Sequence, residues 1–326
     1  MTSMIGRREV LLGAGALGLA AAPPHAAEAR APLAAAQAPG FYRHRVGSIE
    51  VTALLDGNFA FPNQALPSLF ARYDEAIANR LRREAFGPAQ GVPLAVNAFL
   101  VNTGDRLILI DAGAARALGP NLGQIQANLQ AAGVAPGDID VIVCTHMHRD
   151  HCAGLLTESG EAVFPNAELQ IAEADVAYWT DTAAEASAPA PLKPFFPVAR
   201  QVVAAYGNRV KRIALESEVA SGVRTQAIPG HTPGHIGVHV ASGSDQLLMW
   251  SDVVHAQSLQ FARPDWSISF DSDPALAAQT RVRVFDQVAT DRIVIAGSHL
   301  TFPGLGYVVK RSEGYDFVPA MWRSPL

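Results

Sequence analysis

The chain has 326 residues, of which 49% are hydrophobic and 17% are charged, so it carries enough apolar material for a sizeable core. Its formal charge is −5 and no basic run appears along it, which argues against nucleic-acid binding driven by phosphate contacts. Ten histidines against two cysteines favour imidazole-based metal chemistry over a thiolate site or a disulfide framework.

The first 31 residues have the pattern of an export signal. Arg7 and Arg8 precede an uncharged stretch, residues 10–22, which suits a signal but is too short to span a bilayer of about 30 Å. Paired arginines at this place are typical of the twin-arginine route, with an ordinary secretory signal or a disordered Ala-rich tail as the alternatives. We therefore expect a periplasmic or secreted protein. No later stretch is long and apolar enough to cross a membrane.

Residues 32–40 are Ala/Pro-rich and are expected to be a linker, and residues 41–326 are expected to form a single α/β domain. Short β-type runs there alternate with helical patterns, which predicts two sheets with outer helices. Strands are predicted at 49–55, 96–101, 107–110, 139–144, 168–171, 224–228, 236–240, 247–250 and 292–295, and helices at 121–132, 173–182, 198–206 and 274–289.

Two connecting segments carry turn or loop signals. Asp56-Gly57 ends the first predicted strand and is interpreted as a turn. The Pro-rich segment 188–197, with Phe195 and Phe196, is interpreted as a surface loop.

The sharpest motif is His146-Met147-His148-Arg149-Asp150-His151, directly after a predicted buried strand. Three imidazoles and one carboxylate are more than one tetrahedral ion can accept from so short a loop, so they suit two neighbouring ions. His146 and His148 fit one ion, and Asp150 and His151 fit the other. A surface cluster or a structural zinc site is the alternative, but the complete string after a strand favours two ions.

Three later residues complete this set. His231, Asp252 and His299 each lie just beyond a predicted strand. Strands that end at the same edge of a sheet bring such residues together, so we expect all three to converge on the first motif.

This spacing resembles the metallo-β-lactamase superfamily, whose fold is an αββα sandwich with metals at one edge. Segments from about residue 39 onward are similar to its methyl parathion hydrolase group, among them Thr52-Ala53-Leu54-Leu55-Asp56-Gly57, Gly119-Pro120-Asn121-Leu122-Gly123 and Phe302-Pro303-Gly304. The resemblance implies that one ion is bound by His146, His148 and His231, that the other is bound by Asp150, His151 and His299, and that Asp252 bridges both.

The chemistry implied by this site is hydrolysis. Two cations sharing a hydroxide, held through the catalytic carboxylates Asp150 and Asp252, lower the pKa of that water enough to give a nucleophile near neutral pH. Zinc is the first expectation for the two divalent ions, and manganese, cobalt and iron also suit this donor set. Flavodiiron relatives place a glutamate where this chain has His148, which argues against redox chemistry.

Four further residues are interpreted by their position relative to the motif or to His231. Asp111 resembles an aspartate that orients a ligand imidazole, and the alternative is a cap on the next turn. His235 either orients the loop carrying His231 or is an ordinary loop histidine. Cys144 and Cys152 are interpreted as small buried residues.

The resemblance also places a pocket around the substrate, formed by Leu118, Trp179, Phe196, His255 and Phe270. Its aromatic wall favours a flat, apolar or aromatic substrate. Methyl parathion hydrolases carry aliphatic residues at the positions of His255 and Phe270, and an aromatic residue at that of Leu118. Because an imidazole and a larger ring leave less room for a tetrahedral phosphotriester, lactones or aryl esters rank first and phosphotriesters second.

Other functions remain as alternatives to ester hydrolysis. They are β-lactam hydrolysis, hydrolysis of a glutathione thioester, and a non-catalytic periplasmic metal-binding protein. A homodimer is implied by the resemblance alone.

Overall fold

The computed structural model describes residues 33–325, and Pro39–Leu326 forms one compact unit of the chain. The predicted export signal lies outside the described residues. Residues 33–40 contain neither helix nor strand. Within the described part, no helix is both long and apolar enough to traverse a bilayer.

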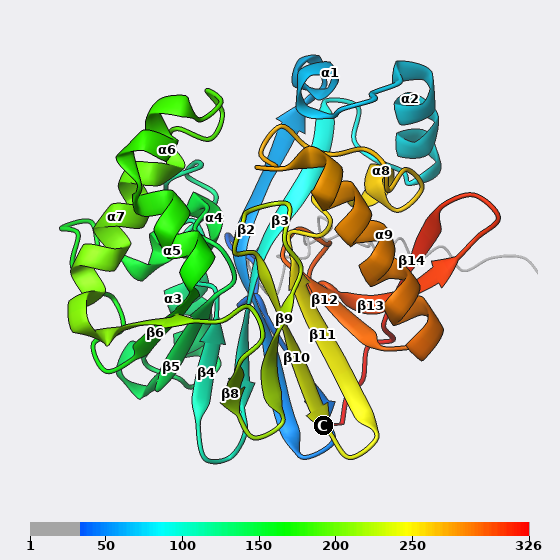
Figure 1. Cartoon of the computed structure of the whole chain (residues 1–326). Coiled ribbons are helices and arrows are strands. Elements are labelled where there is room, and N and C mark those ends of the chain that lie inside the picture. Colours follow the sequence, from blue (N-terminus) through cyan, green and yellow to red (C-terminus); the bar gives the residue numbers. More distant parts are fainter. Residues whose placement is uncertain (1–32, 326) are drawn as a thin grey trace, which may run out of the picture. The chain divides into compact units, whose positions relative to one another are not determined.

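The described residues form two seven-stranded mixed sheets (Figure 1). The first sheet follows chain order: β1 (Phe41–Val46), β2 (Ile49–Pro62), β3 (Gly91–Asn102), β4 (Leu107–Ile110), β5 (Val141–Cys144), β6 (Glu168–Ala172) and β7 (Val210–Ile213). The second has the order β14 (Tyr315–Pro319), β13 (Leu305–Lys310), β12 (Val294–Gly297), β11 (Asp245–Ser251), β10 (Ile236–Ser242), β9 (Val223–Ala227) and β8 (Glu218–Ala220).

Helices cover both outer faces, so the expected αββα sandwich is confirmed (Figure 1). The first sheet carries α3 (Ile125–Ala131), α4 (Arg149–Cys152), α5 (Glu173–Thr180), α6 (Thr182–Ser187) and α7 (Phe195–Tyr206), and the second carries α9 (Pro274–Asp291). The short helices α1 (Leu66–Leu69), α2 (Glu75–Glu84) and α8 (Gln257–Gln260) lie around the long ends of β2 and β3. Single 3-10 turns occur at Asn63–Ala65, Pro136–Asp138, Ala153–Leu155 and Gly207–Arg209.

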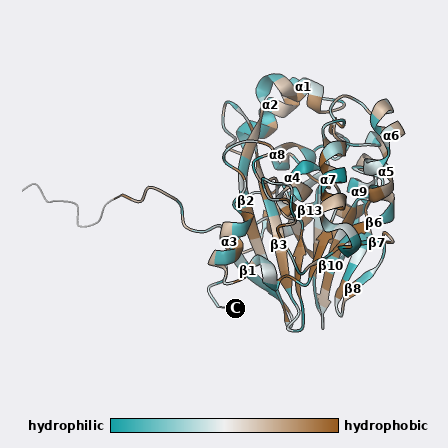
Figure 2. Ribbon diagram, turned by 90° about the vertical axis from the view of Figure 1, so that its left-hand side faces the viewer, coloured by the Kyte–Doolittle hydropathy of each residue, from teal (hydrophilic) through white to brown (hydrophobic). Residues whose placement is uncertain are grey.

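The central strands consist largely of hydrophobic residues (Figure 2), and these pack on both sides because each sheet is covered on both faces. In β5, Val141 and Val143 pack between the two sheets, whereas Ile142 and Cys144 pack under the helices of the first layer. The strand β11 repeats this division in the second sheet, where its side chains pack alternately against the first sheet and against α9. This double burial explains why the sequence shows continuous apolar runs there instead of polar alternation.

The topology gathers several strand ends at one edge. Strand β4 pairs in parallel with β5, and β11 pairs in parallel with β12. The carboxyl ends of parallel neighbours meet at the same edge of a sheet, where ligands are commonly bound. The loops after these strands carry the motif residues.

The predicted elements agree with the structure except at some ends. Strand β2 does not stop at Asp56-Gly57 but continues to Pro62 through a bulge, in which Gly57 has a φ of 145°. The segment 188–197 is only partly a loop, because α7 begins at Phe195. Strand β12 begins at Val294, since Arg292 adopts the left-handed conformation that ends α9.

Candidate metal centre

All seven residues that the sequence singled out as metal ligands lie together at the sheet edge. His146 and His148 follow β5, and the short helix α4 turns Asp150 and His151 toward the same point. The loops after β9, β11 and β12 bring in His231, Asp252 and His299.

These residues form two groups of four that share Asp252. One group is His146, His148, His231 and Asp252, and the other is Asp150, His151, Asp252 and His299. Within each group the candidate ligand atoms lie within 4.8 Å of one another. This division agrees with the one that the family resemblance implied.

The carboxylate of Asp252 lies at the centre of both groups. Its Oδ2 atom faces a ring of imidazole Nε2 atoms, at 3.1 Å (His255), 3.2 Å (His299), 3.4 Å (His231) and 3.7 Å (His146). Its Oδ1 atom lies 3.1 Å from Nε2 of His151. Oδ2 thus lies near imidazoles of both groups and Oδ1 near His151 of the second group, so the carboxylate of Asp252 is within reach of both groups.

Hydrogen bonds on the far side of three rings fix their orientation. Nδ1 of His151 lies 2.8 Å from Oδ2 of Asp111, Nδ1 of His231 lies 2.7 Å from Oδ1 of Asp271, and Nδ1 of His299 lies 2.9 Å from a backbone carbonyl, that of Ala95. These acceptors require an N–H at Nδ1, so a neutral ring presents its Nε2 lone pair to the centre.

The residues fit divalent metal ions. The Nε2 atoms of His146 and His151 are buried and have no hydrogen-bond partner. Nδ1 of His148 and Nε2 of His231 are 2.9 Å apart and both face the first group. Converging lone pairs of this kind, with two carboxylates among them, can hold cations between them, and imidazole with carboxylate oxygen suits zinc and its first-row neighbours.

Burial and the neighbouring charges both shift the pKa values of the site residues. Burial lowers the pKa of His146 and His148 well below the ordinary value. Burial has the same tendency at His231 and His299, but nearby carboxylates outweigh it and raise their pKa to about 9 and about 10. Burial alone would raise the pKa of Asp252, yet the surrounding imidazoles hold it well below its usual value. The carboxylates therefore give the site a strong preference for positive charge.

Asp175, on α5, ties the two histidine loops together. It is fully buried, and its carboxylate accepts the N–H of Met147 at 2.9 Å and the N–H of Gly234 at 2.8 Å. Burial raises its pKa to about 6, although these hydrogen bonds act in the opposite direction. Asp175 thus fixes the loop of His146 and His148 against the loop of His231.

The backbone is strained beside two site residues. Asp111 and Ser251, which precedes Asp252, have φ values of 60° and 48°. Non-glycine residues adopt this conformation at a cost, usually where surrounding contacts enforce it. Here Asp111 also accepts the N–H of Thr145 at 2.8 Å, so it joins the end of β4 to the ligand loop after β5.

His235 contacts the backbone next to two of the loops that carry candidate ligands. Its Nε2 accepts the N–H of Asp252 at 3.4 Å, and its Nδ1 lies 3.1 Å from the carbonyl of Ile228. The ring is buried, with its centroid 5.0 Å from that of His146. The Nδ1 contact lies just before the loop that carries His231, and the Nε2 contact lies at Asp252. Cys144 and Cys152 are buried and free, as expected.

A cavity of about 200 Å³ opens onto the metal groups. Three of the predicted pocket residues line it: Leu118, His255 and Phe270. Besides candidate ligands, the lining includes six residues that the sequence analysis did not assign to the pocket: Phe59, Phe61, Leu94, Arg149, Pro191 and Phe195. The alternation of Phe59 and Phe61 with other residues is typical of a strand and would have predicted the extension of β2. The sequence analysis ended this strand at Asp56-Gly57 because that pair is typical of a turn.

The structure corrects the pocket prediction at two positions. Trp179 and Phe196 are fully buried and do not line the cavity. Phe196 packs against Trp179 with ring centroids 4.7 Å apart, and Trp179 meets the ring of His148 at 5.1 Å. Successive residues of a helix point about 100° apart, so Phe195 faces the cavity when Phe196 faces the core.

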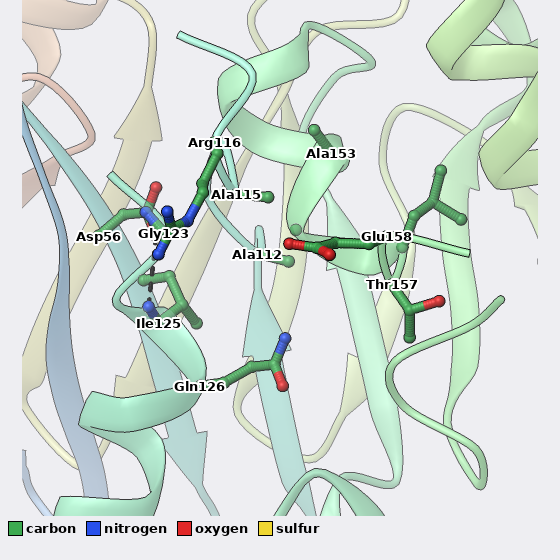
Figure 3. Close-up of a pocket in the computed structure, with 12 residues that line it drawn as sticks. Asp56, Ala112, Ala115, Arg116, Gly123, Ile125, Gln126, Ala153, Thr157 and Glu158 are labelled. Carbon is green, nitrogen blue, oxygen red and sulfur yellow. Dashed lines mark hydrogen bonds between the residues drawn. The ribbon is translucent and has the colours of Figure 1, made fainter. Parts of the chain in front are cut away.

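A second cavity, of about 270 Å³, is lined by Arg116, Gln126 and Glu158, among others, and by none of the metal-group residues (Figure 3). At its wall, the buried carboxylate of Asp56 accepts the backbone N–H of Ala114 at 2.9 Å and that of Ile125 at 3.2 Å. These bonds order the loop that carries Leu118 into the cavity beside the metal groups. The bulge in β2 thus contains the residue, Asp56, that holds this loop in place.

Asp271 orients the ring of His231 through its contact with Nδ1. The sequence analysis did not assign this role to Asp271, which lies just before the helix predicted from residue 274. Asp271→Asn is expected to weaken binding of the ion on the His231 side about 10- to 100-fold, because the ring loses a charged acceptor that fixes its tautomer. Zinc titration against a competing chelator measures this. Asp273→Asn is the matched control, because asparagine caps α9 as well as aspartate does. Equal affinity in both variants would contradict the assignment.

Comparison with known proteins gives matches over most of the chain. Residues 91–299, which include all seven clustered residues, match the model of the Metallo-beta-lactamase superfamily. A hydrolase of the beta lactamase superfamily, AbOPH, is 32% identical with a TM-score of 0.83, over 89% of this chain and 100% of its own. AidC, described as a dizinc quorum-quenching lactonase in complex with a product, is 28% identical with a TM-score of 0.82, over 87% and 99%.

A probable metal-dependent hydrolase from Staphylococcus aureus is 21% identical with a TM-score of 0.70, over 87% of this chain and 100% of its own, a likeness of fold alone. None of the curated proteins matches the chain.

Proposed function

Because the chain belongs to the metallo-beta-lactamase superfamily, we propose that it is a dinuclear metal-dependent hydrolase that cleaves lactones or aryl esters. The observation that carries this proposal is the shared carboxylate of Asp252, placed between two four-residue groups at the floor of an apolar cavity. A metal-storage or sensing protein would not need such a cavity beside its ligands.

The proposed roles follow from the geometry. Two divalent ions held by the two groups would supply an activated water and a Lewis acid for the substrate's carbonyl oxygen. Asp252 belongs to both groups and would be a ligand to both ions. We assign to Asp150 the role of receiving a proton from the attacking water, which is supported by its position in the cavity lining and by its Oδ2 atom 3.4 Å from Nε2 of His299. No nucleophilic side chain is required.

The cavity wall supports a flat substrate. Phe270 lies between Phe61, at 6.4 Å with an interplanar angle of 32°, and Phe195, at 6.1 Å with an angle of 73°. Rings in this arrangement leave a narrow apolar space, which suits a planar lactone or aryl ester better than a tetrahedral phosphotriester. The relative AidC, named as a dizinc lactonase, supports the same ranking. Membership of the methyl parathion hydrolase group stays a proposal, supported by the shared sequence segments.

Initial rates on three substrates test the ranking. We expect kcat/KM for dihydrocoumarin and phenyl acetate to exceed that for methyl paraoxon by at least about tenfold, since a difference of about 1.4 kcal/mol in transition-state fit gives that ratio. The zinc-loaded protein is assayed, with the metal-depleted protein as the blank. A higher kcat/KM for methyl paraoxon would reverse the ranking and make phosphotriester hydrolysis the main activity.

Zinc as the metal, export to the periplasm or beyond, and a homodimer are also proposed. The donor set supports zinc, the Arg7-Arg8 segment supports export, and family resemblance supports the dimer. Elemental analysis of purified protein, fractionation of expressing cells and light scattering test them in turn. Iron in place of zinc, retention in the cytoplasm, or a monomer at micromolar concentration would each overturn the corresponding proposal.

A further inference from the structure

Arg149 is a charged residue of the motif at 146–151 to which the proposed mechanism gives no role. It lies between the candidate ligands His148 and Asp150 and begins the helix α4. Its side chain lines the catalytic cavity, where Cζ stands 5.4 Å from the centroid of the Phe195 ring. The chain thus places a permanent cation in the wall of the cavity, next to the metal groups.

The guanidinium of Arg149 has no protein counter-charge. Among the described residues, it makes no ion pair and no hydrogen bond, and its Nε is buried without a partner. Arg281 shows what a structural arginine does in this fold: it is buried, and its guanidinium donates to the carbonyls of Val253 and Pro264 at 2.6 and 2.8 Å. Arg149 has only its contact with the Phe195 ring.

The surroundings of Arg149 strengthen its interaction with a negatively charged group. Much of the cavity wall is apolar, formed by side chains such as Leu94, Leu118 and Phe61. Charge interactions are stronger beside such surfaces than in water. The two carboxylates in the cavity, Asp150 and Asp252, belong to the metal groups, so neither is free to neutralise the arginine.

We propose that Arg149 binds an anionic oxygen of the substrate, so that esters carrying a carboxylate are preferred to neutral esters of the same shape. This rests on the proposed ester hydrolysis and narrows its substrate class. The planar guanidinium offers paired N–H donors, which match the two oxygens of a carboxylate. Stacking on Phe195 holds the group in place while its donors stay available.

Two pairs of esters test the preference. One pair is 4-acetoxybenzoate and methyl 4-acetoxybenzoate, with the charge on the alcohol side, and the other is phenyl hydrogen adipate and its methyl ester, with the charge on the acyl side. The readout is the ratio of kcat/KM for the acid to that for its methyl ester. We expect wild type to favour the acid in at least one pair, and Arg149→Gln to lower that ratio about 10- to 100-fold, as expected for a lost charge-assisted hydrogen bond.

Matched variants separate a local effect from a change in net charge. Arg149→Lys keeps the charge and should retain part of the preference, whereas Arg116→Gln removes an arginine of the other cavity and should leave the ratio as in wild type. The inference is overturned if wild type shows no preference in either pair. It is equally overturned if Arg149→Gln keeps the ratio, which would assign carboxylate binding to the metals, or if Arg116→Gln lowers it as much.

A binding measurement keeps this inference distinct from the proposed function. Calorimetry on the zinc-loaded protein with 4-acetamidobenzoate, the amide analogue of the first acid, and with N-phenyladipamic acid, that of the second, needs no turnover. The analogue of the preferred acid should bind wild type at least about tenfold more tightly than Arg149→Gln. If no ester is hydrolysed but this difference appears, ester hydrolysis fails and the arginine site stands. If esters are hydrolysed but both proteins bind the analogues equally, the arginine site fails alone.

Discussion

Asp252→Ala is expected to release at least one metal ion and to lower kcat/KM by about a thousandfold or more, since several kcal/mol of transition-state stabilisation depend on the metal pair. The reason is that Asp252 belongs to both groups and faces five imidazole nitrogens within 3.1–3.7 Å. Without its carboxylate, the ions lose their shared ligand and repel one another. Elemental analysis of the purified variant and initial rates on phenyl acetate measure both effects.

Asp291→Ala is the matched control, because Asp291 ends α9 on the exposed surface and makes no ion pair within the described structure. It should hold two ions and keep wild-type rates. A variant Asp252→Ala that keeps two ions and full activity would refute the dinuclear proposal.

Removal of metal by a chelator is expected to abolish hydrolysis and to lower Tm by about 10 °C or more. An ion that binds only the folded chain stabilises it by about 4 kcal/mol when its free concentration is a thousand times Kd. Each kcal/mol corresponds to about 2–4 °C in a domain of this size class. The physical source of the effect is the buried set of imidazoles and carboxylates, in which the Nε2 atoms of His146 and His151 have no hydrogen-bond partner.

Calorimetric scans before chelation, after dialysis and after addition of zinc measure this effect. Zinc should restore both Tm and activity, whereas magnesium should restore neither, because it prefers an octahedral shell of oxygen ligands. Full activity in protein shown by elemental analysis to be free of metal would contradict the proposed function.

The sequence predicted the layered fold because its signals are local and repeated. Apolar runs such as 139–144 and 247–250 are continuous only when both faces of a strand are covered, which indicates central strands of a sandwich. The helix beginning at Pro274 was visible because proline at its first turn follows a capping aspartate. These patterns depend on near neighbours in the chain, so they need no tertiary information.

The ligand set was also accessible from the sequence. Four of its members lie within six residues, and the other three each follow a strand that ends at the same edge. The supporting residues were less accessible. Asp271 and Asp175 lie 40 and 28 residues from their partners His231 and Met147, and no local pattern marks an aspartate that accepts a hydrogen bond from so distant a group.

The sequence by itself determined the two-sheet architecture and the seven clustered residues, because hydrophobic period and strand-end position are encoded locally. Only the tertiary structure decided which rings face the substrate. Phe195 and Phe196 are adjacent and chemically identical, and a rotation of about 100° along α7 places one in the cavity and the other in the core. The starting residue of that helix, and with it the shape of the pocket, depends on packing against α5, which no local pattern contains.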